Sequence, residues 1–153
     1  NVIGFDWKEI SIIFTIMLIP FVLVDAPLGR LADKKWGEKE MLAIGFIIMG
    51  ISTAALVFFG FKSFIAWAIM LFLTRVGAAI AEDMIEIYFF KKVDGKDPAV
   101  LSMFRVTRPL SYFIAPVITT IGLVYTTDKY LFVILGAACL LTLLPILKIK
   151  DTN

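Results

Sequence analysis

The chain has 153 residues, of which 60% are hydrophobic and 18% are charged, and its mean hydropathy is +0.92. A soluble globular domain is usually about 45–50% apolar, so this composition excludes an ordinary soluble domain and indicates a membrane protein. The net charge of +2 is too small to indicate binding to nucleic acid. The chain has no histidine, which excludes imidazole metal sites and histidine proton relays.

Long apolar segments separated by short polar connections predict five transmembrane helices. A span of the bilayer needs about 20 mostly apolar residues. The segments that meet this requirement are approximately residues 7–28, 39–60, 64–90, 98–125 and 130–147. Because the connections are short, successive helices should be antiparallel neighbours. The predicted fold class is therefore all-α: a polytopic membrane protein with a single membrane domain over residues 1–153.

Lysine and arginine are distributed unevenly between the connections. Nine of them lie in residues 30–39, 91–96 and 148–150, which all fall on one side of the predicted bundle. The three that fall on the other side are Lys8, Lys62 and Lys129. Cytoplasmic loops of membrane proteins carry the excess of basic residues. The pattern predicts an N-terminus outside and a C-terminus in the cytoplasm, in a plasma or inner membrane.

The connection between the first two predicted spans carries the sequence Gly29-Arg30-Leu31-Ala32-Asp33-Lys34-Lys35-Trp36-Gly37-Glu38-Lys39. This segment resembles the signature loop of the major facilitator superfamily, in which a glycine, an acid, a base and a second glycine followed by bases join two helices. Gly29 has no side chain and lets another helix approach closely. Asp33 lies four residues later on the same helical face and can pair with an arginine or a helix N-terminus.

The resemblance implies both a function and a role for this loop. Members of the family are secondary transporters in which two six-helix halves rock about a central site. In the family, the loop latches the two halves on the cytoplasmic side and helps to hold the outward-facing state. The resemblance assigns this role of conformational latch to Gly29, Asp33, Lys34, Lys35 and Gly37. An ordinary basic loop without a switching role is the alternative interpretation.

The loop departs from the family pattern at two places. Lys34, Lys35 and Trp36 stand between the acid and the second glycine, where the family often has two residues, and Glu38 stands where a base is common. These departures resemble the weaker second copy of the loop, so we expect the chain to be a C-terminal fragment that corresponds to helices eight to twelve. Helices two to six are the alternative. The absence of an initial methionine also indicates that N-terminal helices of the same transporter are missing.

The third and fourth predicted spans carry charged residues that are costly within a membrane. An ionisable side chain costs about 2.5–3.5 kcal/mol at the centre of a span, so such residues normally face the bundle interior and find partners. They are Arg75, Glu82, Asp83 and Glu86 in the third span and Arg105 and Arg108 in the fourth. The helical period places Arg75, Glu82 and Glu86 on one face. We predict an intramembrane charge network that links the two antiparallel spans.

Two interpretations of this network stay open. Three acids balance three arginines, which favours a structural ion-pair network that holds the two spans together. Alternatively, some of the carboxylates bind protons or substrate during transport. Arg75 is the best candidate for contact with the substrate, because it lies nearest to the expected midplane, where transporter sites lie.

The predicted function is secondary active transport of a small solute by alternating access, without enzymatic activity. The expected partners are the lipid bilayer, a small-molecule substrate and the missing helices, with no metal or other cofactor. The alternative is a small membrane scaffold or accessory subunit without transport activity. An intramembrane enzyme is disfavoured, because no serine-plus-base or carboxylate-pair spacing indicates one. We expect that the 153 residues alone do not transport, because they supply only part of one half.

Overall fold

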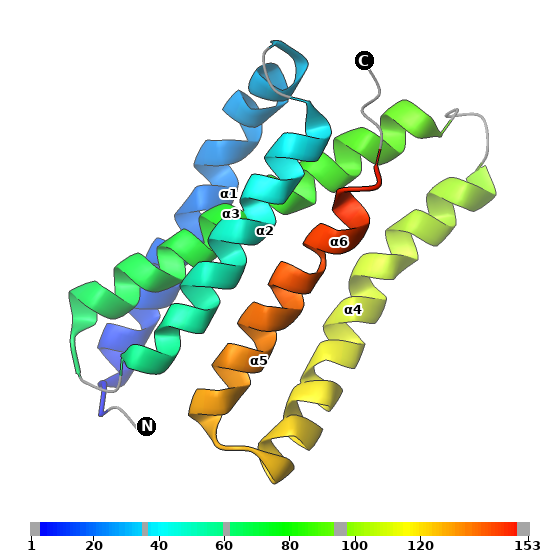
Figure 1. Ribbon diagram of the computed structural model, residues 1–153. Helices are drawn as coiled ribbons and strands as arrows, with labels where there is room; N and C mark the ends of the chain where they lie inside the picture. The colour runs from blue at the N-terminus through cyan, green and yellow to red at the C-terminus, as the bar shows by residue number, and fades with distance from the viewer. Residues whose placement is uncertain (1–3, 35–36, 60–61, 94–97, 150–153) are drawn as a thin grey trace.

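The computed structural model describes residues 4–34, 37–59, 62–93 and 98–149, and these residues form helices joined by short connections (Figure 1). The helices are α1 (Trp7–Lys34), α2 (Glu38–Ala55), the 3₁₀ turn η1 (Leu56–Phe58), α3 (Phe64–Lys92), α4 (Pro98–Tyr125), α5 (Asp128–Leu141) and α6 (Leu143–Ile146). A single residue, Thr142, separates α5 from α6, so the two follow one path. The predicted all-α fold with five helical segments is confirmed.

Three of the helical segments have the length and the apolar composition needed to cross a membrane. They are Glu38–Phe58, Phe64–Lys92 and Pro98–Tyr125, with mean hydropathies of 2.3, 2.0 and 1.2. A further apolar stretch, Tyr130–Ile146, is shorter and contains the junction of α5 and α6. The limits of the five predicted spans stay a prediction.

Local sequence explains where several helices begin. Proline is favoured in the first turn of a helix because it lacks an N–H group, and α4 begins at Pro98. α2 begins after Gly37 and α3 begins after Ser63, and both of these residues have extended backbone angles. Two further prolines, Pro109 and Pro116, lie inside α4.

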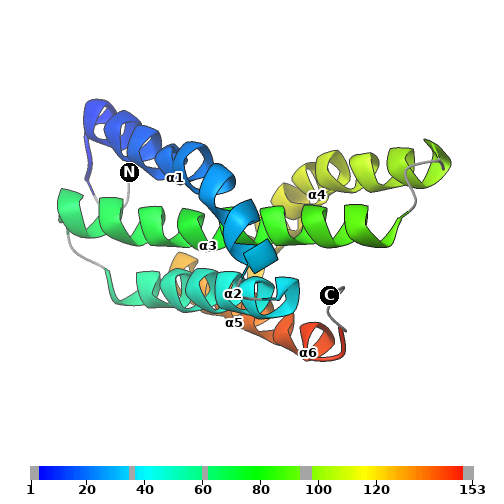
Figure 2. The same cartoon turned by 90° about the horizontal axis from the view of Figure 1, so that it is seen from above.

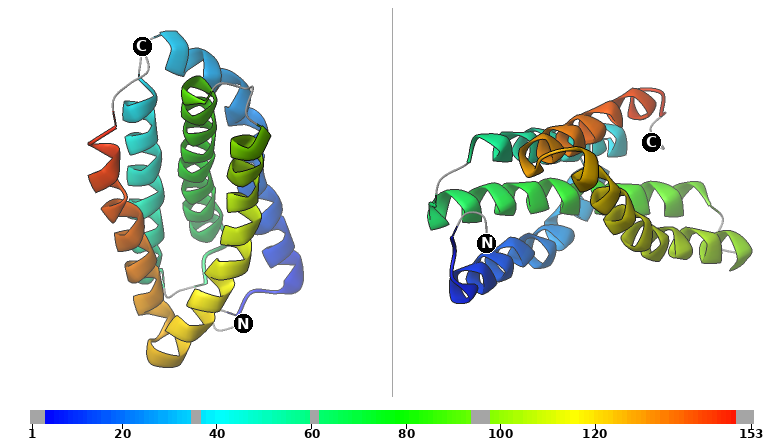
Figure 3. Two further views of the ribbon diagram at one scale, coloured as in Figure 1. Left: turned by 90° about the vertical axis from the view of Figure 1, so that its right-hand side faces the viewer. Right: turned by 90° about the horizontal axis from the view of Figure 1, so that it is seen from below.

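α3 lies in the middle of the bundle, between two groups of helices. α1 and α4 lie on one side of α3, and α2, α5 and α6 lie on the other side (Figures 2 and 3). α3 packs closely against α1 and α2, and α2 also packs against α5. α4 leans away from this packed group, and none of its residues is buried. Two acids of α3, Glu82 and Glu86, therefore face two arginines of α4, Arg105 and Arg108, across a loosely packed helix pair.

Glycines allow α2 to approach both of its neighbours closely. A methyl group on Gly77 of α3 would lie 2.6 Å from the backbone nitrogen of Met49 and 2.7 Å from the carbonyl oxygen of Gly45. A methyl group on Gly136 of α5 would lie 2.8 Å from the carbonyl oxygen of Gly50. Backbone thus meets backbone at both crossings, as is common at interfaces of small residues between membrane helices.

The buried core of the described residues lies between α2, α3 and α6. It consists of Met41, Leu42, Ile80, Ala81, Met84 and Ile146. A polar contact adds to the interface of α2 and α3, because Thr74 Oγ1 lies 2.9 Å from the Oγ atom of buried Ser52 and donates a hydrogen bond to it. α3 is thereby fixed against α2 along much of its length, and it presents Glu82 and Glu86 to α4.

Candidate functional site: a charged cavity between α3 and α4

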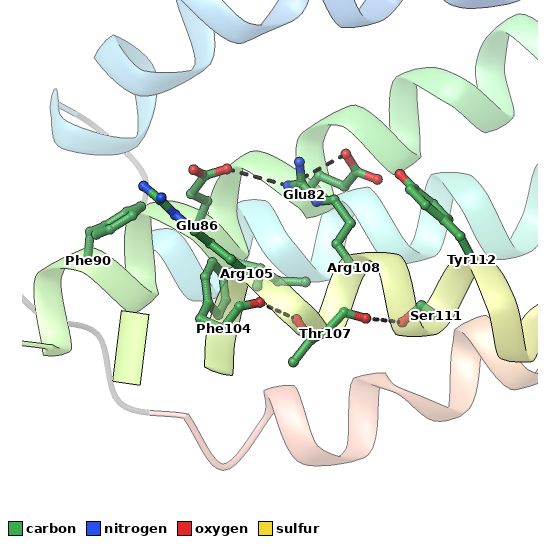
Figure 4. Close-up of a pocket in the computed structure, with 10 residues that line it drawn as sticks. Glu82, Glu86, Phe90, Phe104, Arg105, Thr107, Arg108, Ser111 and Tyr112 are labelled. Carbon is green, nitrogen blue, oxygen red and sulfur yellow. Dashed lines mark hydrogen bonds and ion pairs between the residues drawn. The ribbon is translucent and has the colours of Figure 1, made fainter. Parts of the chain in front are cut away.

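A cavity of about 380 Å³ lies between α3 and α4, and charged side chains from both helices line it (Figure 4). The charged lining residues are Glu82, Glu86, Arg105 and Arg108, the hydroxyl-bearing ones are Thr107, Ser111 and Tyr112, and the apolar ones are Ile85, Phe90 and Phe104. Residues three or four apart in sequence share one face of a helix. The spacing of the two glutamates on α3 and of the two arginines on α4 therefore places each pair on the face that lines the cavity.

One arginine bridges the two glutamates. Arg108 Nη2 lies 3.4 Å from Glu86 Oε2 and 3.9 Å from Glu82 Oε2. All three side chains remain between 39% and 49% exposed, so the contacts are open to a ligand. A single guanidinium thus serves two carboxylates: it donates a hydrogen bond to Glu86 and makes a longer ion pair with Glu82.

Arg105 also lines the cavity, and its guanidinium lies near Glu86 in the view of Figure 4. Its side chain extends towards Phe90 (Figure 4). No ion pair of Arg105 with any described carboxylate is present, although Arg108, one turn away, has two. The two arginines therefore differ in environment, and only Arg108 links α3 to α4 by ion pairs in the part of the chain that is described.

Aromatic rings close the end of the cavity that lies towards the last turn of α3. The rings of Phe89 and Phe104 stack with 3.8 Å between their centroids and an angle of 9° between their planes. Phe90 lies edge-on to both, at 5.6 Å from Phe89 and 6.3 Å from Phe104. These three phenylalanines are not among the site residues predicted from the sequence. The signal of this cluster in the sequence is the pair of phenylalanines that ends the third apolar segment, opposite a phenylalanine at the start of the fourth.

Two residues of the predicted charge network lie elsewhere. Arg75 is half-buried on α3, almost two turns before Glu82, and it does not line the cavity. Asp83 is also half-buried, and it is not among the residues that line the cavity. The structure thus brings together four of the six predicted residues, Glu82, Glu86, Arg105 and Arg108, in one cavity.

A second charged contact joins α2 to α3. The carboxylate of Glu38, in the first turn of α2, is 1% exposed and accepts a hydrogen bond of 2.5 Å from Nζ of Lys91, in the last turn of α3. An acid in a first turn and a base in a last turn both complement the helix dipole. In antiparallel neighbours these two turns lie at the same end of the bundle. An acid in the first turn of one helix and a base in the last turn of the next is therefore the sequence feature that points to this pair.

Comparison with known proteins agrees with this helical arrangement. The family model of the Major Facilitator Superfamily matches residues 2–153. The chain belongs to this family. No curated protein and no solved structure matches the chain.

Membership of the Major Facilitator Superfamily confirms several of the expectations from sequence. The chain is an integral membrane protein of a transporter family, and it is not an enzyme. A lipid bilayer and a solute are therefore its partners as a member of this family.

The latch loop of the Major Facilitator Superfamily lies only partly within the described residues. Gly37 immediately precedes α2, and its carbonyl oxygen accepts a hydrogen bond of 3.2 Å from the backbone of Met41. Gly29, Asp33 and Lys34 belong to the helical backbone of α1, and their side chains lie outside the described residues, as does the whole of Lys35. The latch role of these residues stays a prediction.

Proposed function

We propose that this chain is part of a secondary active transporter that moves a small solute across a membrane by alternating access. The match of the Major Facilitator Superfamily to residues 2–153, which include every described helix, is the observation that supports this function. Alternating access requires groups of helices that move as units about a site. The close backbone crossings of α2 with α3 and α5 favour one such unit, against which the loosely packed α4 can shift.

A reconstituted full-length protein provides the test. The protein is placed in liposomes, and uptake is measured by mass spectrometry for a mixture of amino acids, sugars, organic acids, nucleosides and organic cations. Saturable uptake of at least one solute, absent from protein-free liposomes, is the expected result. A scaffold or accessory subunit, the alternative function, predicts no uptake of any of them.

We infer that the chain corresponds to helices eight to twelve of the transporter. The three residues between Asp33 and Gly37, and the acid at position 38, favour the second copy of the loop over the first. The upstream coding sequence distinguishes the two assignments. Seven further spans before residue 1 are expected for helices eight to twelve, whereas a single span before it would require helices two to six.

Arg75 remains our candidate for contact with the substrate. It carries a positive charge within a predicted span, and no ion pair of Arg75 is present among the described residues. Replacement Arg75→Ala in the full-length protein should lower uptake about tenfold or more, because a hydrogen bond to a charged group contributes about 1.5–3 kcal/mol. Lys62→Ala, at an exposed position before α3, is the control. Uptake at the wild-type rate in Arg75→Ala would exclude this role.

We propose that Arg108 and its two glutamates act as a structural ion-pair network that holds α4 against α3. The distances of 3.4 and 3.9 Å support this role, since they join α3 and α4, the two helices whose described residues line the cavity. Proton or substrate binding by these carboxylates is the second possibility. The mixed charges of the cavity favour binding of a substrate that carries both a positive and a negative group.

A further inference from the structure

We propose that the cavity between α3 and α4 binds a small zwitterion, a molecule that carries an ammonium group and an acid group a few ångströms apart. This inference deepens the proposed function, because it names a ligand class for the charged cavity. It rests on the proposed function only in treating the ligand as the transported solute. Three observations carry it: a positive pole, a negative pole and a balanced total charge.

Arg105 forms the positive pole. Its guanidinium lines the cavity, and no described carboxylate lies within the 4.0 Å of an ion pair to it. A guanidinium presents planar N–H donors in a fork that matches the two oxygens of a carboxylate or phosphate group. Arg105 is therefore available to an acid group that enters the cavity, whereas Arg108 already contacts two carboxylates.

The two glutamates form the negative pole. Glu82 and Glu86 share the single positive charge of Arg108, so these three side chains together carry one net negative charge. The side chains of Glu82 and Glu86 remain 39% and 47% exposed. An ammonium group has three N–H donors and no acceptor, which suits a position beside two carboxylates.

Charge balance favours a ligand with no net charge of its own. The two glutamates and two arginines of the cavity sum to zero. A net charge in a region of low dielectric is costly, so a simple cation or a simple anion would upset this balance. A zwitterion places one charge at each pole and leaves the sum unchanged, and an apolar ligand would leave both poles without partners.

The size and the remaining lining also fit a small zwitterion. A cavity of about 380 Å³ lies at the lower end of the range of about 300–1,000 Å³ that is usual for small-molecule pockets. The hydroxyls of Thr107 and Ser111 donate to helix carbonyls, at 2.6 and 2.8 Å, so they present acceptor lone pairs to the cavity. The rings of Phe90 and Phe104 provide an apolar wall for the rest of the ligand.

This chemistry has two sources near a membrane, a free α-amino acid and the headgroup of phosphatidylethanolamine. The full-length protein in detergent, free of lipid, is therefore titrated with each of the 20 amino acids, and its melting temperature and heat of binding are measured. In parallel, its melting temperature is compared in nanodiscs that contain phosphatidylethanolamine or the anionic phosphatidylglycerol. A rise in melting temperature with an amino acid, or with phosphatidylethanolamine over phosphatidylglycerol, is expected and identifies the source.

Variants at the two poles test the assigned roles. Arg105→Gln should weaken binding of the zwitterion about tenfold or more, as expected for the loss of one charge-assisted contact. The same variant should bind the corresponding amine, which is the same molecule without its acid group, as tightly as the wild type does. Glu86→Gln tests the negative pole, and it should weaken the binding of both the zwitterion and the corresponding amine. Lys92→Gln, which removes an exposed cation of α3 outside the cavity lining, is the matched control and should bind as the wild type does.

Two outcomes would overturn the inference. One is a melting temperature that stays the same with every amino acid and with phosphatidylethanolamine. The other is an equal loss of binding affinity in Arg105→Gln and Lys92→Gln. Binding of a zwitterion without uptake of any solute would contradict the proposed function alone. Uptake of another class of solute, together with no binding of zwitterions, would contradict the inference alone.

Discussion

At the level of single residues, the contact between Glu38 and Lys91 is a charged contact with a buried carboxylate. Glu38 is 1% exposed, and its carboxylate accepts a hydrogen bond from Nζ of Lys91. A buried carboxylate that loses a charged partner keeps its desolvation penalty and loses an attraction that offset part of it. The contact lies beside Gly37, so it also fixes the end of the predicted latch loop against the last turn of α3.

Replacement Lys91→Met should destabilise the full-length protein. The expected loss is about 1–3 kcal/mol, the usual penalty for a buried polar group that loses its partner, and it is measured by unfolding in a titration with denaturing detergent. Lys92→Met is the matched control, because Lys92 is exposed and its ammonium group lies over the ring of Tyr88. Equal stabilities of the two variants would show that the contact with Glu38 contributes nothing.

At the level of helices, close backbone contact distinguishes the α2–α3 interface from the α3–α4 interface. Gly45 and Gly77 bring the backbones of α2 and α3 together, whereas no residue of α4 is buried. α4 contacts α3 through the stack of Phe89 on Phe104 and through the ion pairs of Arg108. The first interface is therefore closed to added atoms, and the second is held by few side chains.

Gly77→Ala should destabilise the protein by about 1–3 kcal/mol, the usual cost of added atoms in a packed interface. The new methyl group would lie 2.6 Å from the backbone nitrogen of Met49, and a backbone cannot rotate away as a side chain does. Gly122→Ala is the control, because its methyl group would meet only Leu131 Cδ1, at 3.3 Å. A Gly77→Ala protein as stable as the Gly122→Ala protein would contradict the close crossing of α2 and α3.

The stack of Phe89 on Phe104 should show direct energetic coupling between α3 and α4. A double-mutant cycle with Phe89→Leu and Phe104→Leu is expected to give a coupling energy of about 0.5–1.5 kcal/mol, the value typical of aromatic pairs. Leucine retains most of the apolar area, so the cycle isolates the contact between the rings. Additive effects of the two replacements would place the rings apart in the assembled transporter.

At the level of the whole molecule, the helix connections gather basic residues at one end of the bundle. The end of α1, the beginning of α2, the end of α3 and the end of α6 lie together there (Figure 1). Lys91 and Lys92 lie in the last turn of α3 and Lys148 follows α6, so they belong to this end, whereas Lys62 precedes α3 and belongs to the other. Because cytoplasmic segments are enriched in lysine and arginine, the first end is the one that we propose for the cytoplasm.

Cysteine labelling tests this orientation in intact cells. Lys62→Cys and Lys148→Cys are made separately in the full-length protein after replacement of its cysteines, including Cys139, by serine. A membrane-impermeant maleimide should label Lys62→Cys from outside, and it should label Lys148→Cys only after the cells are permeabilised. The reverse pattern would invert the proposed orientation of the chain.

The sequence by itself determined the class of the protein, its helices and its family. Apolar runs and short connections are local properties, so they identify helices without knowledge of packing. The period of a helix also determined that Glu82 and Glu86 share a face, as do Arg105 and Arg108. The loop from Gly29 to Gly37 carried the family resemblance, which the match to residues 2–153 supports.

Only the tertiary structure decided which of these faces meet and which atoms pair. Arg108 pairs with both glutamates, and Arg105 forms no ion pair with a described carboxylate. Glu38, which the sequence presented as a departure from the family loop, is buried against Lys91. The helical period fixes which side chains share a face, but the rotation and crossing of two helices depend on packing between residues far apart in sequence. Here that packing is set by glycines such as Gly45 and Gly77, whose close backbone contact determines how α3 is turned and hence what it presents to α4.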